Sequence, residues 1–210
     1  MFESTVYRQR RQVLADTLGS GVVLLPGAPP SPRNYTDNVY PYRQSSHLLY
    51  YAGLRDPGLF VVLDIDEGRG VLYGRPRTMD DVVWCGEQPS LEALAEAAGL
   101  DEARDIELLA DDLAAAAVRS GKLHYLPVFR AAVAAQLAGL VAREADAVLR
   151  GSSPALTRAV AEQRLVKEDR EIAEIEEALE GTRQAYLAVM AGVRPGMVLS
   201  LIHISEPTRH

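Results

Sequence analysis

Hydrophobic positions along this chain fall into two patterns, which are short continuous runs and stripes with helical spacing. The runs are bounded by glycine, proline or charged residues, as is typical of buried strands. They predict strands at residues 22–27, 47–54, 59–65, 70–74 and 122–128. In the stripes, apolar residues recur three or four positions apart, as they do on one face of a helix. They predict helices at residues 5–18, 90–100, 106–121 and 129–151.

Strands and helices alternate in this order, which predicts an α/β layered domain. The sequence "DEGRG" at residues 66–70 joins two of the strands as a hairpin, in which Gly68 and Gly70 are expected to take positive φ angles. Ser90 is expected to cap the helix that follows it, and Gly99 is expected to end that helix.

A turn-rich stretch, "GSSPAL" at residues 151–156, predicts the end of a first domain that comprises residues 1–150. After it, apolar residues recur at helical spacing from Leu165 to Met190 with charged residues between them. The chain contains no internal repeat and no low-complexity tract.

Charge and composition narrow the classes of function. The chain has 22 Lys and Arg against 29 Asp and Glu, a net charge of -7, which argues against nonspecific binding to nucleic acid or to a membrane surface. No stretch approaches the roughly 18 consecutive apolar residues of a membrane span. The single cysteine excludes an internal disulfide framework and favours a reducing compartment. We therefore expect a cytoplasmic protein.

Motifs that bind phosphate or dinucleotides, or that build a nucleophile elbow, are missing from the sequence. His47 and His124 are each a candidate ligand or base, or more simply a half-exposed structural histidine. Cys85 has no histidine near it in sequence and is expected to be a buried structural thiol.

The acidic residues are open to two interpretations. Asp64 and Asp66 flank Ile65 at the hairpin edge, so they point the same way and either hold a metal ion or solvate the turn. The adjacent pairs Asp80–Asp81 and Asp111–Asp112 are interpreted as helix-start charges that complement the helix dipole. Local chemistry therefore predicts no assembled active site in this chain.

Three segments resemble the N-terminal domain of the aminopeptidase P family, the Xaa-Pro aminopeptidases. The first, "RNYTDNVYPYRQSSHLLYYAGLRDPG", spans residues 33–58. The second, "VVWCGEQPS", spans residues 82–90, and the third, at residues 162–197, resembles the entry to the family's catalytic domain and ends in "RPGM". In the first segment the resemblance is carried by Arg33, Asn34, Asp37, Tyr40, Pro41, Tyr42, Arg43, Gln44, Ser46, Tyr50, Tyr51, Gly53 and Pro57.

The residues of the first segment also have a direct physical interpretation. Pro41 presets the turn into the predicted strand that follows, and Arg43 offers a planar fork to a carboxylate, for which Asp37 is a candidate. Alternatively, the segment only locks a loop onto the sheet.

The resemblance implies a mixed β-sheet flanked by helices, followed by the helical start of a missing pita-bread catalytic domain. In the family, two Asp, one His and two Glu hold two divalent metal ions, usually manganese, and all five ligands would lie downstream of "RPGM". The resemblance thus implies a truncated metallopeptidase that removes an N-terminal residue preceding proline, and a homo-oligomer, either a dimer or a tetramer. This chain would be its inactive, architectural part. A non-enzymatic peptidase-like binding module, and a prolidase or other creatinase-fold hydrolase, remain alternatives.

Trp84, the only tryptophan, follows two valines and precedes Gly86, so we predict a strand end or a loop there. One interpretation is a core anchor, because tryptophan is highly buried on average. The resemblance implies another, in which Trp84 lines the substrate cleft of a neighbouring subunit and is partly exposed in this chain. No residue of the chain is expected to be catalytic or to bind a metal.

The final residues, "LSLIHISEPTRH" at 199–210, differ in composition from the rest of the chain. Their back-translation resembles the transposon-end adapter of sequencing libraries, so we interpret them as adapter read-through on a truncated gene, with a genuine divergent tail as the alternative. Residues 151–198 are then a linker and the first helices of the catalytic domain.

Overall fold

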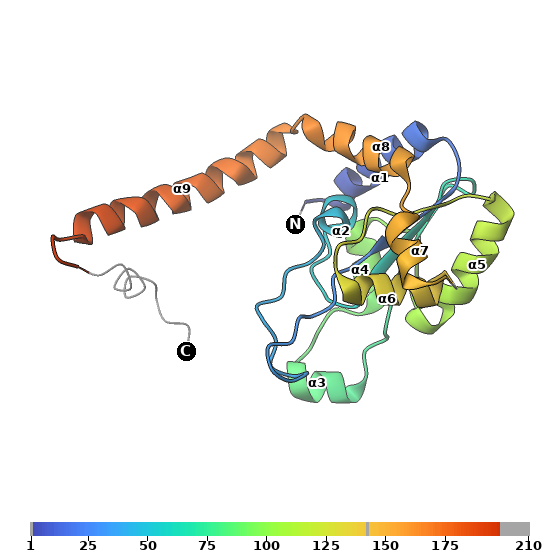
Figure 1. Cartoon of the computed structure of the whole chain (residues 1–210), viewed down its shortest axis with the longest axis horizontal. Helices are drawn as coiled ribbons and strands as arrows, with labels where there is room; N and C mark the ends of the chain where they lie inside the picture. Colours follow the sequence, from blue (N-terminus) through green and yellow to red (C-terminus); the bar gives the residue numbers. More distant parts are fainter. Residues whose placement is uncertain (1, 142, 198–210) are drawn as a thin grey trace. The chain divides into compact units, whose positions relative to one another are not determined.

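A five-stranded sheet forms the centre of the first compact unit, Met1–Gln163, in a computed structural model that describes residues 2–141 and 143–197 (Figure 1). The strand order is β4-β3-β2-β1-β5, and the strands are β1 (Val22–Pro26), β2 (Phe60–Asp64), β3 (Arg69–Gly74), β4 (Glu102–Asp105) and β5 (Leu123–His124). The β1–β2 and β2–β3 pairs are antiparallel, whereas β3–β4 and β1–β5 are parallel. This confirms the mixed sheet that the sequence predicted.

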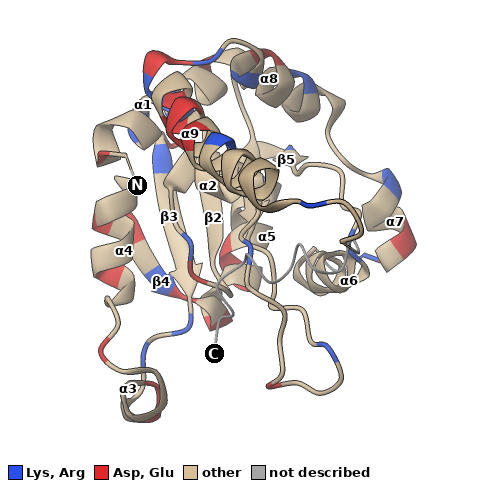
Figure 2. Cartoon of the chain, turned by 90° about the vertical axis from the view of Figure 1, so that its left-hand side faces the viewer, with Lys and Arg blue, Asp and Glu red and all other residues tan. Residues whose placement is uncertain are grey.

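Helices cover both faces of the sheet, so the first unit has three layers. Figure 2 shows α1 and α4 to one side of the strands and α6 and α7 to the other. The first face is covered by α1 (Ser4–Leu18), α2 (Ser46–Ala52), α4 (Leu91–Ala98) and α8 (Pro154–Leu165). The second face is covered by α5 (Leu109–Ser120), α6 (Ala131–Leu140) and α7 (Ala145–Arg150). The remaining helices are α3 (Met79–Cys85), the 3₁₀ turn η1 (Ile106–Leu108) and α9 (Asp169–Gly192). None of the described helices is both long and apolar enough to cross a membrane.

Burial on both faces explains the continuous apolar run of β1. Val23 and Leu25 belong to the core under α1, α2, α4 and α8, whereas Val22 and Leu24 belong to the core under α5, α6 and α7. All four side chains are at most 1% exposed. Because successive side chains of a strand point to opposite faces, a strand between two helical layers needs an apolar residue at every position.

The predicted strand at residues 47–54 is wrong, because this segment forms helix α2. Leu48, Tyr51 and Ala52 are buried at spacings of three and four residues, which suits one face of a helix. Gly53 ends the helix at φ 70°. A Cβ atom there would lie 2.2 Å from the Tyr7 ring, so only glycine fits. A short apolar run by itself does not distinguish a strand from a buried helix.

The long helix predicted at residues 129–151 is also wrong, because the segment forms two helices. Helix α6 ends at Leu140, α7 begins at Ala145, and the two helices pack against each other. This packing brings Val148 into the same core as Val133. The alanine-rich sequence favours helix throughout, so the break reflects tertiary packing rather than local propensity.

Two smaller predictions need correction. Gly68 has φ 65°, as the hairpin requires, but Gly70 is a regular strand residue opposite Leu63. A Cβ atom on Gly70 would lie 2.9 Å from a methyl carbon of Leu100, so a larger residue there would require the Leu100 side chain to shift. The other helices predicted in the first domain lie close to their expected positions, and Ser90 and Gly99 take the predicted cap and stop positions.

The compact units divide between Gln163 and Arg164, later than the turn-rich boundary predicted at residues 151–156. Leu156 and Val160 of α8 are buried in the core of the first unit, so α8 is structurally part of it. The assignment of residues 151–198 to the start of a further domain remains a prediction. The interpretation of residues 199–210 falls outside the described residues.

The guanidinium group of Arg11 joins three helices of the first face. Arg11 is 8% exposed, and its Nη1 atom donates hydrogen bonds to the carbonyl oxygens of Tyr51 (2.7 Å) and Ala98 (2.9 Å). Its Nη2 atom donates to the carbonyl oxygen of Gly99. These carbonyls end α2 and α4, where a cation is favoured by the helix dipole. Burial lowers the pKa of Arg11 to about 10, so the group stays charged at neutral pH.

We expect Arg11→Met to lower the free energy of unfolding by about 2–4 kcal/mol, because it leaves buried carbonyls without a donor. Urea denaturation followed by circular dichroism measures this loss. Arg8→Met is the matched control, because Arg8 lies on the same helix with an exposed side chain, and its effect should stay within about 0.5 kcal/mol. Equal losses in the two variants would contradict a special role for Arg11.

Candidate functional site

The segment around Gln44 lies between β1 and α2 and is held by a buried amide. The Oε1 atom of Gln44 accepts hydrogen bonds from the backbone N–H groups of Ala28 (2.7 Å) and Ser45 (2.8 Å). Its Nε2 atom donates to the carbonyl oxygen of Asp56 at 2.6 Å. Gln44 is 6% exposed, so one side chain ties together the end of β1, the start of α2 and the loop that leads to β2.

Tyr42 adds a second anchor to the same loop. Its hydroxyl donates a hydrogen bond to the carbonyl oxygen of Ala28 at 2.8 Å. Burial and, to a smaller extent, the nearby carboxylate of Asp56 raise the pKa of Tyr42 to about 12, while Arg130 opposes the rise. The hydroxyl therefore remains a protonated donor at neutral pH, and these contacts hold the loop against the sheet.

Arg43 does not take the partner expected for it. No ion pair or hydrogen bond joins Arg43 to Asp37 in the described part of the chain, so that pairing is wrong. The exposed Arg43 side chain instead lines a cavity together with His47, which lies in the first turn of α2 rather than on a strand. Arg130 contributes to the same cavity from the segment after β5. Arg130 was not predicted as a site residue from the sequence. Its position just after a predicted strand could have indicated it, because ligands of α/β proteins commonly bind at the carboxyl ends of strands.

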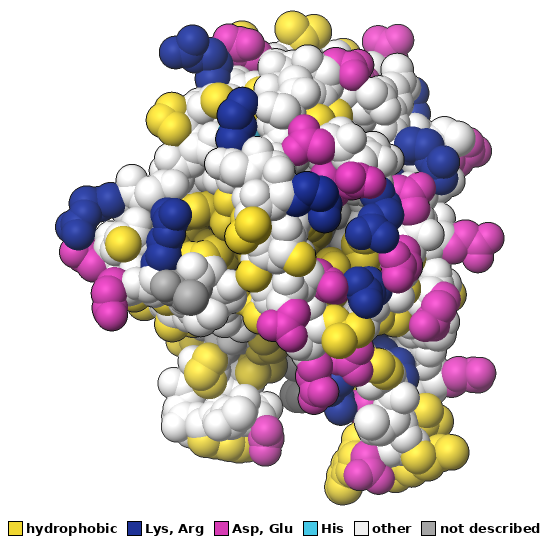
Figure 3. Space-filling view, turned by 90° about the vertical axis from the view of Figure 1, so that its right-hand side faces the viewer, with side chains coloured by type: hydrophobic (Ala, Val, Ile, Leu, Met, Phe, Trp, Pro, Cys, Tyr) yellow, Lys and Arg dark blue, Asp and Glu magenta, His cyan; other side chains and the backbone are white. Residues whose placement is uncertain are grey.

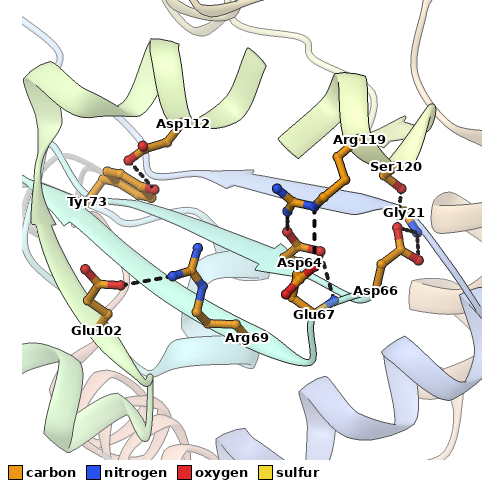
Figure 4. Close-up of polar contacts among 10 residues, drawn as sticks. All are labelled: Gly21, Asp64, Asp66, Glu67, Arg69, Tyr73, Glu102, Asp112, Arg119 and Ser120. Carbon is orange, nitrogen blue, oxygen red and sulfur yellow. Dashed lines mark hydrogen bonds and ion pairs between the residues drawn. The ribbon is translucent and has the colours of Figure 1, made fainter. Parts of the chain in front are cut away.

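The two carboxylates proposed as a possible metal pair have separate protein partners (Figure 4). Asp64 is buried and forms an ion pair with Arg119 of α5, and it accepts a hydrogen bond from the backbone N–H of Glu67 at 3.2 Å. Asp66 accepts hydrogen bonds from the hydroxyl of Ser120 and from the backbone N–H of Gly21. The hydrogen bond from Ser120 is the main reason that the pKa of Asp66 is lowered. Both carboxylates thus fasten the hairpin to its neighbours.

The described residues do not fit a metal centre, because they contain no group of three or more His, Cys, Asp or Glu side chains placed to hold an ion. The Nδ1 atom of His124 lies 2.8 Å from the Ser153 hydroxyl, which also caps the start of α8 by accepting from the N–H of Leu156. Cys85 is exposed, so its predicted burial is wrong.

Trp84 lies in helix α3, not at a strand end or in a loop, and its side chain is 85% exposed. The interpretation of Trp84 as a core anchor is therefore wrong. Two other large apolar side chains of the same helix, Met79 at 75% and Val83 at 71%, are also exposed. On the face drawn in Figure 3, hydrophobic side chains gather on two projections at the lower edge, where Figure 1 draws α3 and the loop between β1 and α2.

Helix α3 begins with a capping box, which explains how such an exposed helix forms. The hydroxyl of Thr78 accepts a hydrogen bond from the N–H of Asp81 at 3.3 Å, and the carboxylate of Asp81 accepts from the N–H of Thr78 at 2.8 Å. Arg75 pairs with the same carboxylate at 2.6 Å. The predicted helix-start position of Asp80–Asp81 is confirmed, as is that of Asp111–Asp112 in the first turn of α5.

Comparison with known proteins agrees with this architecture. A family model described as "Aminopeptidase P, N-terminal domain" matches residues 7–124. The Xaa-Pro aminopeptidase of Escherichia coli (strain K12) is 28% identical over 210 residues, which cover 91% of this chain and 45% of that protein. A probable Xaa-Pro aminopeptidase of Pyricularia oryzae is 31% identical over 83% of this chain and 36% of its own length. A human Xaa-Pro dipeptidase is 27% identical over 44% of this chain and 19% of its own length.

Solved structures show the same relationship. A zinc-substituted E. coli aminopeptidase P in complex with product matches 96% of this chain and 48% of that chain, with a TM-score of 0.79 and 25% identity. Proline aminopeptidase P II from Yersinia pestis, at 24% identity, shares the fold with a TM-score of 0.80 over 96% of this chain and 48% of that chain. The chain thus spans about half the length of these relatives.

The capping box of α3 predicts a local response to acid. Hydrogen bonds from the backbone and hydroxyl of Thr78, then from Arg75, lower the pKa of Asp81 from 3.8 to about 2. The pKa of Asp81 is lower in the folded state than the ordinary value of 3.8 that we take for the unfolded state. The carboxylate therefore stabilises α3 fully above about pH 3.8, and this contribution is lost as the pH falls toward about 2. Fluorescence of Trp84, the only tryptophan, should report the change over this pH interval.

The variant Asp81→Asn should remove this fluorescence change, whereas Asp80→Asn should keep it. An unchanged transition in Asp81→Asn would contradict the assignment.

Proposed function

Because the chain belongs to the aminopeptidase P N-terminal domain family, we propose that it is the N-terminal part of a metal-dependent Xaa-Pro aminopeptidase. Such an enzyme removes the N-terminal residue of a peptide whose second residue is proline. The observation that carries the proposal is the match to E. coli aminopeptidase P across nearly the whole chain, sheet and later helices included. The names of the E. coli and fungal relatives support the same activity.

In this proposal the described residues supply architecture and subunit contacts rather than catalytic groups. The side chains that the sequence offered as metal ligands have structural partners, as Asp64 has in Arg119. The proposal assigns two divalent metal ions, expected to be manganese, to residues of the complete enzyme downstream of Met197. The zinc-substituted E. coli relative supports a divalent ion in the family. We also propose a cytoplasmic homo-oligomer, either a dimer or a tetramer.

Helix α9 supports the assignment of the later residues to the entry of a catalytic domain. Its stripe of large apolar side chains is exposed, and no residue of the helix is buried. An amphipathic helix in a folded enzyme normally buries such a stripe. We propose that the stripe packs on the catalytic domain. It comprises Ile172, Ile175, Leu179, Tyr186, Leu187 and Met190.

A second candidate function is that of a dipeptidase, which the partial match to a human Xaa-Pro dipeptidase favours. The two activities differ in the length of the peptide they accept, since a dipeptidase acts on Gly-Pro and an aminopeptidase acts on longer peptides such as Gly-Pro-Ala. A non-enzymatic binding module would cleave neither substrate.

We expect the chain of 210 residues neither to bind Mn²⁺ tightly nor to cleave Gly-Pro-Ala, whereas the complete enzyme should cleave Gly-Pro-Ala in the presence of Mn²⁺. Calorimetric titration with Mn²⁺ and release of free glycine measure the two properties. Turnover by the chain above the buffer blank would contradict its architectural role. A complete protein that cleaves only Gly-Pro would support the dipeptidase, and one that cleaves neither peptide would support a binding module.

We further propose that Trp84 lines the substrate cleft of a neighbouring subunit. Because its side chain is 85% exposed, Trp84→Ala should change the free energy of unfolding of this chain by less than about 0.5 kcal/mol. A core substitution such as Leu48→Ala should cost about 2–5 kcal/mol. In the complete oligomer, Trp84→Ala should raise KM or lower kcat.

Val83→Ala is the matched control for the kinetic effect, because Val83 is the adjacent exposed residue of the same helix. It should leave both kinetic constants close to those of the parent enzyme. Normal kinetics in Trp84→Ala, or the same kinetic defect in Val83→Ala, would rule out a specific cleft role for Trp84.

A further inference from the structure

The sheet contains a topological switch point at β1 and β5. These neighbouring strands are parallel, with Val22 opposite Leu123 and Val23 opposite His124. After β1 the chain continues to α2 on one face of the sheet, whereas after β5 it continues to α6 on the other face. Where connections leave in opposite directions, a crevice opens at the carboxyl ends of the strands, and ligands of α/β proteins commonly bind there.

A cavity of about 330 Å³ occupies this crevice. Its walls come from three segments that are distant in sequence. They are residues 25–28 at the end of β1, residues 43–47 before and within α2, and residues 126–130 after β5 together with Val133 of α6. The volume lies at the lower end of the range of roughly 300–1,000 Å³ that is usual for small-molecule sites. The cavity is therefore large enough for a compact ligand but too small for a folded partner.

The lining of the cavity combines an apolar surface with positive charge. Leu25, Leu126 and Val133 contribute apolar surface, while Arg43 and Arg130 contribute guanidinium groups. No Asp or Glu lines the cavity, although acidic residues outnumber basic ones in the chain by 29 to 22. Within the described ranges neither guanidinium forms an ion pair with a carboxylate. The contact found for Arg130 is with the Phe129 ring, whose centroid lies 5.7 Å from the Arg130 Cζ atom.

Two backbone donors at this edge are already engaged, so the charged side chains are the groups that we consider for a ligand. The N–H of Gly27 donates to the carbonyl oxygen of Leu59 at 2.8 Å, and the N–H of Ala28 donates to Gln44. The guanidinium forks of Arg43 and Arg130 remain as the groups that suit an anion. Arginine binds carboxylates through two parallel N–H···O bonds, and such charge-assisted bonds are roughly twice as strong as neutral ones.

We infer that this crevice binds a small carboxylate with an apolar body. Arg43 and Arg130 would bind the carboxylate at the rim, and Leu126 and Val133 would contact the apolar part. The inference does not depend on the peptidase activity, since it uses only residues of the first compact unit and no metal.

The test is a titration of the full ¹⁵N-labelled chain with N-acetyl-L-phenylalanine, followed by amide chemical shifts. Its neutral amide, N-acetyl-L-phenylalaninamide, has the same apolar body without the charge, and inorganic phosphate has charge without an apolar body. We expect saturable shifts at Gly27, Ala28 and Val128 with the acid. The neutral amide should bind about tenfold more weakly than the acid, which corresponds to the loss of one charge-assisted hydrogen bond.

Variants assign the effect to the crevice. Arg43→Gln and Arg130→Gln should each weaken binding of the acid about tenfold. Arg158→Gln, which changes an exposed arginine of α8 that does not line the cavity, should leave it unchanged. Because all three side chains are exposed, the variants should fold, and equal unfolding temperatures check this.

Three outcomes would overturn the inference. They are equal affinity for the acid and its amide, phosphate binding as tight as that of the acid, and unchanged affinity in both cavity variants. Absence of saturable shifts up to about 20 mM acid would overturn it as well, since affinity weaker than that is below the range of specific small-ligand binding. None of these results would bear on the peptidase proposal, because activity is not measured.

Discussion

Burial of the Arg11 guanidinium is the constraint on which the first helical layer depends. A buried cation is costly to desolvate unless several acceptors surround it, and Arg11 has the carbonyl oxygens of Tyr51, Ala98 and Gly99. Those carbonyls can meet at one point only if α2 and α4 end beside the middle of α1. The hydrogen bonds therefore hold the C-terminal ends of α2 and α4 against α1.

Two-sided burial of the central strands provides the second constraint. Because β1 is apolar on both faces, helices must cover both sides of the sheet, and the chain must leave β1 and β5 in opposite directions. The crevice at the switch point follows from this arrangement. The motif residues around Gln44 have a physical role there, since Gln44 and Tyr42 hold the crevice wall in place.

Some side chains of the first unit hold the fold together through hydrogen bonds and ion pairs, and others are exposed without such contacts. Asp64, Gln44 and Asp81 are each engaged by two or more hydrogen bonds or ion pairs with residues of the chain. Trp84 and Arg43 are exposed and make no comparable contacts among the described residues. This division is consistent with the architectural and subunit-contacting role that we propose for the chain.

The sequence by itself determined the layered α/β class, strands β1, β2 and β3 nearly to the residue, the cap at Ser90 and the helix-start position of Asp80–Asp81, because these depend on local periodicity and on short-range hydrogen bonds. It also identified the family, since the motif residues are adjacent in the chain. It missed β4, and of the strand predicted at residues 122–128 only Leu123–His124 form β5. Only the tertiary structure decided that residues 47–54 are helical and that the alanine-rich segment breaks in two, because packing against a sheet face overrides an ambiguous local pattern. Likewise, the pairing of Asp64 with Arg119 and the placement of Arg43 and Arg130 around one cavity involve residues far apart in sequence, and no local signal predicts such arrangements.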